Sequence, residues 1–124
     1  MFFRSLFYER NVLMHLERIQ QLPAEIQAEI AKRVGNFIEV ARSVSDDVLQ
    51  RFAQTAREER QRAVELGAKS DMDPLWAAPA ISEAWCNAKL GLATGNLDAK
   101  SAIEIVVAIE KFTTMKASEP QRKA

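Results

Sequence analysis

The sequence predicts an all-α fold: a single-domain bundle of four to five helices whose last two helices form an antiparallel hairpin. Apolar residues recur every three or four positions along almost the whole chain, which is the spacing of one helix face. No sustained alternation of polar and apolar residues occurs, and neither Asn-Gly nor Asp-Gly, the usual hairpin turns, is present. Four glycines and four prolines provide few turns, which suits long helices joined by short connections.

The first helix is predicted over residues 4–22, with apolar side chains gathered on one face. The residues expected to point inward are Tyr8, Val12, Leu13, Leu16 and Ile19. Pro23 follows, and because proline is tolerated in the first turn of a helix, the second helix is predicted over residues 24–43. Translation from Met14 is an alternative, in which residues 1–13 would be an extension.

Residues 26–56 carry apolar side chains every three or four positions without a gap, so they fit either one long helix or two. A break near residues 43–46 is favoured, because Ser43 and Ser45 precede two aspartates, a helix N-cap signal with acidic residues in the first turn. The apolar step also exceeds the 3.6 residues of a helical turn, so the stripe would drift around one straight helix. The third helix is therefore predicted over residues 46–67.

Glycine and proline set the next boundaries. Gly67 supplies a helix stop, because glycine readily adopts the left-handed conformation that ends many helices. Pro74 could open a helical turn, but Pro79 lacks an N–H group and its ring clashes with the preceding turn. We therefore expect a short turn over residues 74–79 and a fourth helix over residues 80–94.

The fourth helix carries small residues that would let another helix approach closely. They follow at steps of four, four and three: Ala80, Ala84, Ala88 and Gly91. A turn at Gly95 leads to a fifth helix over residues 98–115, and the tail of residues 116–124 is expected to fray. The short connection makes the last two helices antiparallel neighbours.

Residues 97–112 are apolar around most of the helix circumference. One broad face collects Ala99, Ala102, Ile105, Val106, Ile109 and Phe112. Ile103 and Val107 fall instead among charged residues, on the side that should face water. A chain of this length has little protein left to cover a second apolar face. A partner subunit is therefore expected at these two residues.

Further apolar residues crowd the N-terminus. Phe2, Phe3 and Phe7 are interrupted by an arginine, and no small-residue cleavage site follows, which favours neither a signal peptide nor a membrane span. We expect these three residues to pack on the bundle or on a second subunit. The predicted interface therefore consists of Ile103 and Val107 together with the three phenylalanines.

Composition and charge favour an ordered cytoplasmic protein. The chain is 48% hydrophobic and 27% charged, and its formal net charge is zero, so no nucleic-acid partner is expected.

Cys86 is the lone cysteine, which excludes an internal disulfide. Asp71 and Asp73 lack the later acids of a calcium loop, and one histidine with one cysteine cannot close a zinc site, so no metal or cofactor is expected. Residues 55–62, TAREERQR, predict a solvated helix face.

No residue combination predicts catalysis. His15, the only histidine, has no acid four residues away, and Cys86 is predicted in the middle of a helix, where its thiol is not activated. The function hypothesis is a non-enzymatic helical protein–protein interaction or regulatory protein acting as a homo-oligomer, most simply a homodimer. The alternative is a small-molecule-binding or catalytic bundle with an interhelical pocket near Tyr8, Trp76 and Trp85.

Overall fold

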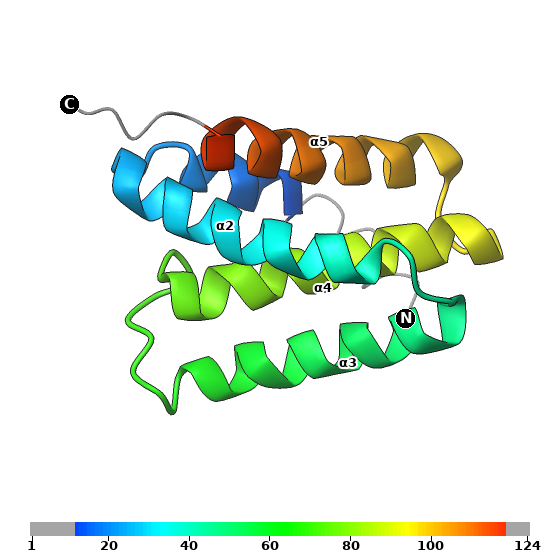
Figure 1. Ribbon diagram of the computed structural model, residues 1–124, viewed down its shortest axis with the longest axis horizontal. Coiled ribbons are helices and arrows are strands. Elements are labelled where there is room, and N and C mark those ends of the chain that lie inside the picture. The colour runs from blue at the N-terminus through cyan, green and yellow to red at the C-terminus, as the bar shows by residue number, and fades with distance from the viewer. Residues whose placement is uncertain (1–11, 119–124) are drawn as a thin grey trace.

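The computed structural model describes residues 12–118 and confirms the predicted all-α bundle (Figure 1). Five helices make up 79% of this part of the chain, which contains no strand. The first covers residues 12–19, and the others are α2 (Ala24–Ala41), α3 (Asp46–Ala63), α4 (Pro74–Thr94) and α5 (Ala99–Ser118). None of the helices described is long and apolar enough to cross a membrane.

Helix α4 lies at the centre of the bundle. It packs most extensively against α3 and also contacts α2 and α5, and α5 runs back alongside it as the predicted antiparallel hairpin (Figure 1). Its buried residues are spread around the whole helix: Ala77, Ala78, Ile81, Ser82, Glu83, Ala84, Trp85, Cys86 and Ala88. The central helix is therefore α4, whereas α5 keeps one face exposed.

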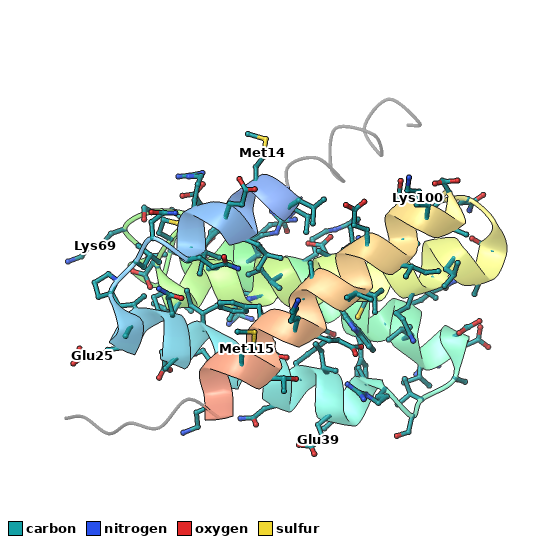
Figure 2. All side chains as sticks on the ribbon, turned by 90° about the horizontal axis from the view of Figure 1, so that it is seen from above. Met14, Glu25, Glu39, Lys69, Lys100 and Met115 are labelled. Carbon is teal, nitrogen blue, oxygen red and sulfur yellow. The ribbon has the colours of Figure 1, made fainter. Side chains whose placement is uncertain are left out.

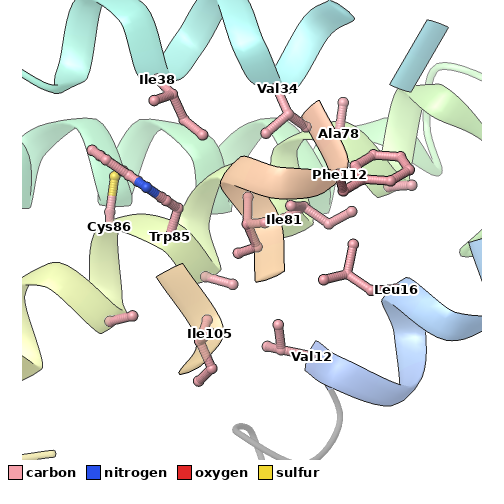
Figure 3. Packing of buried hydrophobic residues seen from close by; sticks show 14 of the residues in the cluster. Val12, Leu16, Val34, Ile38, Ala78, Ile81, Trp85, Cys86, Ile105 and Phe112 are labelled. Atoms are coloured by element: carbon pink, nitrogen blue, oxygen red, sulfur yellow. The ribbon is translucent and has the colours of Figure 1, made fainter. Parts of the chain in front are cut away.

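The core is formed by side chains from all five described helices, and those of residues 12–19, α2, α4 and α5 point toward one another in Figure 3. Trp85 is the largest fully buried side chain. Its indole Nε1 donates a hydrogen bond to Oε2 of Glu110 on α5 at 2.9 Å, so the polar atom of the ring is satisfied inside the bundle. Glu110 also lies 3.7 Å from Nη2 of Arg42, which extends the link beyond the end of α2.

Two helices, not one, cover residues 24–63. Helix α2 ends at Ala41, and Ser45 caps α3 by accepting a hydrogen bond from the backbone N–H of Val48 at 3.4 Å. The break therefore lies where the serines and aspartates predict it. Helix α3 ends at Ala63, four residues before its predicted end, because the chain then tightens into a turn.

That turn depends on a glycine in the left-handed region. Gly67 has a φ of 103°, and the N–H of Ala68 donates to the carbonyl of Ala63 at 2.9 Å. The N–H of Gly67 donates to the carbonyl of Val64 at 3.2 Å. These two bonds form a Schellman motif, so the predicted role of Gly67 as a helix stop is confirmed.

The predicted turn over residues 74–79 was wrong, because α4 already begins at Pro74 and passes through Pro79. The side chain of Asp73 caps the helix by accepting from the N–H of Leu75 at 3.0 Å, and Pro74 occupies the first turn, where no N–H is needed. Pro79 removes one helical hydrogen bond, at a cost of about 3 kcal/mol. Burial of neighbours such as Ala77 and Ile81 outweighs this local cost.

Helix α5 begins where sequence places it but ends later. Oδ2 of Asp98 accepts a hydrogen bond from the N–H of Ser101 at 3.2 Å, which caps the first turn. The helix continues to Ser118, so residues 116–118 are helical and not part of a frayed tail. The remainder of the predicted tail, and residues 4–11 of the first predicted helix, lie outside the described residues.

The α4–α5 turn brings Leu97 directly over Gly91. Gly95 has a φ of 76°, and the N–H of Leu97 donates to the carbonyl of Gly91 at 3.2 Å. A Cβ atom added at Gly91 would lie 2.7 Å from Cβ of Leu97, well inside van der Waals contact. The missing side chain is therefore required by the hairpin itself.

We predict that Gly91→Ala lowers the free energy of unfolding by about 1–2 kcal/mol, because the backbone of the turn must shift to relieve this clash. Gly35→Ala is the matched control, since Gly35 also lies in a helix but a Cβ there meets only Cβ of Thr113, at 3.8 Å. That control should be stabilising by up to about 1 kcal/mol through helix propensity. Urea unfolding measures both; equal effects of the two substitutions would contradict the close packing of the hairpin.

Candidate functional site

Three large apolar side chains of α5 are exposed: the neighbouring Ile103 and Val107, and Met115 further along the helix. Ile103 is 50% exposed and Val107 is 55% exposed, on the side where the helical spacing predicts them. On the inner face Ile105, Ile109 and Phe112 are buried. Seen from above, no other described helix lies over α5 between Lys100 and Met115 (Figure 2).

Other predicted interface residues lie beyond what the structure describes. Phe2, Phe3 and Phe7 belong to residues 1–11, so the structure does not place them. On the predicted inner face of α5, Val106 is only half-buried and Ala99 is exposed.

A separate cavity of about 350 Å³ lies between the helix of residues 12–19, α3 and the first half of α4. Its lining residues come from these helices and from the loop before α4: Val12, Met14, His15, Arg18, Arg60, Asp71, Trp76, Ala80, Ile81 and Ala84. Ala80 and Ala84, two of the small residues of the fourth helix, are among the lining residues. Trp76 lines the cavity as the pocket hypothesis expects, whereas Trp85 is buried in the core and Tyr8 lies outside the described residues.

His15 is held in place at one edge of the cavity. Its Nε2 lies 2.8 Å from the backbone carbonyl oxygen of Asp71, which can only accept, so we assign the proton to Nε2. The imidazole also makes an edge-to-face contact with Trp76, with ring centroids 5.6 Å apart. Burial lowers the pKa of His15 from its ordinary value, and the hydrogen bond and negative charge of Asp71 offset this only in part. His15 is therefore neutral at pH 7.

Asp71 joins the loop before α4 to the first described helix. Its carboxylate accepts from Nη1 and Nη2 of Arg18, each at 3.3 Å, in a two-pronged ion pair. The same loop is tightened by Asp73, which accepts from the N–H of Lys69 at 3.2 Å as well as capping α4. These contacts agree with structural roles for the two aspartates. No group of three metal-ligating side chains occurs in residues 12–118.

Glu83 is a buried carboxylate that sequence analysis did not identify. Its side chain is only 3% exposed, and it accepts from Nε of Arg57 at 3.0 Å and from Nη2 and Nε of Arg60 at 2.9 and 3.2 Å. Residues 55–62 are largely exposed, as the predicted solvated face requires, but Arg57 and Arg60 also reach the buried Glu83, and Arg60 is itself only 26% exposed. The missed signal is that Glu83 is the only acidic residue within α4.

The same ion pair fixes Arg60 beside Trp76. The guanidinium carbon of Arg60 lies 5.6 Å from the centre of the indole ring, within range of a cation–π interaction. Arg60 thus contacts both the carboxylate of Glu83 and the ring of Trp76. Its orientation is determined by both partners.

Cys86 is fully buried, three residues after Glu83 in the middle of α4. Burial, with a smaller contribution from the charge of Glu83, raises the pKa of the Cys86 thiol to about 12. The thiol is therefore protonated at neutral pH and is not activated as a nucleophile.

Comparisons of the chain with protein-family models, with curated proteins and with solved structures find no match. Two features stand out: the exposed aliphatic pair on α5, and a cavity whose His15, Arg18 and Arg60 are each held by a specific partner. Oriented polar groups beside apolar walls are typical of binding sites.

We predict that Glu83→Gln lowers the free energy of unfolding by about 2 kcal/mol, because two arginines lose their charged acceptor. The expected decrease in the free energy of unfolding is modest because Arg57 and Arg60 retain some access to water, with side chains 48% and 26% exposed. Glu29→Gln is the control: it removes the exposed Arg33–Glu29 pair within α2 and should change stability by less than about 0.5 kcal/mol. Chemical unfolding that gave similar values for the two variants would refute a stabilising role for the buried pair.

We also predict that His15 destabilises the fold on acidification. The unfolded chain takes up a proton at the ordinary pKa of 6.5, whereas folded His15, facing Asp71 and Arg18, does so only at lower pH. The contribution of His15 to the free energy of unfolding is therefore fully present above pH 6.5. It decreases as the pH falls through that value and stops decreasing below the pKa of His15 in the folded state. NMR titration of the single histidine should give a midpoint below 6.5.

The variant His15→Gln isolates this effect. Between about pH 7.5 and about pH 5.5 its unfolding free energy should decrease less than that of the unsubstituted chain, because no other side chain has an ordinary pKa in that window. Identical pH dependences, or a histidine midpoint above 6.5, would contradict the buried neutral imidazole.

Proposed function

We propose that this chain is a non-enzymatic cytoplasmic interaction protein that self-associates, most simply as a homodimer, through the outer face of α5. The observation that carries the proposal is the exposure of Ile103 and Val107 on a helix face that no other described element covers. Large aliphatic side chains next to each other on one helix face are the usual centre of a helix–helix contact.

The energetics support association between identical copies. Burying the exposed half of each aliphatic side chain contributes roughly 1 kcal/mol, and a two-fold contact buries four of them. This gain must exceed the entropy lost on association, so further contacts around the pair are part of the proposed interface. The formal net charge of zero means that two copies do not repel each other at long range.

Charges around the apolar pair are of mixed sign. Lys100, Glu104 and Lys111 are exposed on α5. In an antiparallel two-fold contact, the lysines of one copy can face the glutamate of the other at the rim. Such charge pairs at the rim would fix the relative orientation of the two copies more than they would increase affinity. Ile103 and Val107 remain the proposed centre of the contact.

We predict that the double substitution Ile103→Asp with Val107→Asp converts the protein to a monomer, because four carboxylates would meet at the contact. Sedimentation velocity over a range of concentrations measures the change. The helical circular dichroism should be retained, since both side chains are already half exposed in a single copy. Val40→Asp is the matched control: Val40 is an exposed valine, at 59%, on α2, and its substitution should leave the oligomer intact.

Two results would contradict the proposal. One is an original chain that sediments as a monomer up to the highest soluble concentration. The other is an oligomer whose sedimentation coefficient is the same with and without the two aspartates.

A further inference from the structure

The cavity beside Trp76 has the size and lining of a small-molecule site. Its volume of about 350 Å³ lies at the lower end of the range of roughly 300–1,000 Å³ that ligand pockets span. Apolar side chains form much of its wall: Val12, Met14, Ala80, Ile81 and Ala84. Trp76 adds a flat aromatic surface. An occupant must therefore have an apolar body of limited size.

The polar residues at the cavity carry an excess of positive charge. The cavity is lined by two guanidinium groups, those of Arg18 and Arg60, and by one carboxylate, that of Asp71. Glu83, which is not part of the lining, divides its charge between Arg57 and Arg60. His15 is neutral and contributes no charge. The site therefore favours an anion, and an uncharged apolar molecule would leave this excess uncompensated.

Arg60 is the residue best placed to bind that anion. It uses Nε and Nη2 to reach Glu83, and no described residue accepts a hydrogen bond from its Nη1. Its side chain is only 26% exposed, so its charge is less screened by water than that of Arg18, at 58%. A guanidinium group with free donors binds carboxylate groups with good geometry.

These observations distinguish between classes of anion. Inorganic phosphate would match the charge but would leave the apolar wall and Trp76 in contact with no apolar partner. An organic acid satisfies both parts of the cavity at once. Its carboxylate can lie at Arg60 and its hydrocarbon body along Trp76 and Ile81.

We propose that the cavity between residues 12–19, α3 and α4 binds a small organic acid with an apolar body, whose carboxylate pairs with Arg60. This goes beyond the proposed self-association, since α5 contributes no described residue to the cavity. The ligand-binding proposal and the self-association proposal can therefore fail independently. Ligand binding is measured by the NMR signal of Trp76, and the oligomeric state is measured by sedimentation.

The test uses the full chain and two probes, 1-naphthoate and octanoate, titrated while indole N–H signals are followed by NMR. The chain has two tryptophans, so Trp85, buried and bonded to Glu110, serves as an internal control. We expect a saturable shift of the Trp76 signal with at least one acid and little change at Trp85. Inorganic phosphate and 1-naphthalenemethanol should each bind at least roughly tenfold more weakly, because each lacks one half of the recognition.

Two variants test the location. Ala80→Leu fills the cavity without altering a polar group and should abolish the shift, whereas Ala93→Leu, at an exposed position of the same helix, should not. Arg60→Gln should weaken acid binding roughly tenfold while leaving any binding of the neutral alcohol unchanged. The exposed Arg33→Gln is its control.

Any of three results would overturn the inference. The first is no saturable Trp76 shift with either acid. The second is equal binding of the acid and of either control compound. The third is binding that is unaffected by Ala80→Leu in a variant whose helical spectrum shows that it is folded.

Discussion

Burial of α4 on all sides is the constraint on which the rest of the structure depends. Because α2, α3 and α5 all pack on this helix, its single acidic residue, Glu83, is enclosed with them. A buried carboxylate is tolerated only with close partners, and Arg57 and Arg60 reach over from α3 to provide them. One of these arginines then meets Trp76. The ion pair that the core requires therefore also orients the charged edge of the cavity.

The two proposed surfaces are built from different parts of the bundle. The aliphatic pair lies on the outer face of α5, whereas the described lining of the cavity comes from residues 12–19, α3, α4 and the loop between the last two. An organic acid in the cavity would not occupy the proposed contact between copies. Self-association and ligand binding are thus compatible in one molecule.

Periodicity and capping residues predict most of the architecture, because these are local signals. The serine and aspartates at 43–47 locate the α2–α3 break, and Gly67 and Gly95 locate two helix ends. Pro79 led to a wrong prediction because the hydrogen bond that it removes from a helix is evident from the sequence. The burial that outweighs this loss depends on three other helices and is not. The buried ion pair of Glu83 was not predicted for a related reason. Its arginine partners lie 23 and 26 residues away, and spacing alone does not reveal which helix faces which.

The small size of the buried side chains of α3 has a consequence for how the bundle opens. Of its four buried residues, three are alanines: Leu49, Ala53, Ala56 and Ala63. Detaching α3 exposes less hydrocarbon than detaching a helix rich in isoleucine, so it is the natural first unit of sub-global unfolding. Its amides would then exchange with deuterated solvent before those of α4. Arg60 belongs to α3 and lines the cavity, so detachment of α3 would also widen the cavity entrance and let a solute enter.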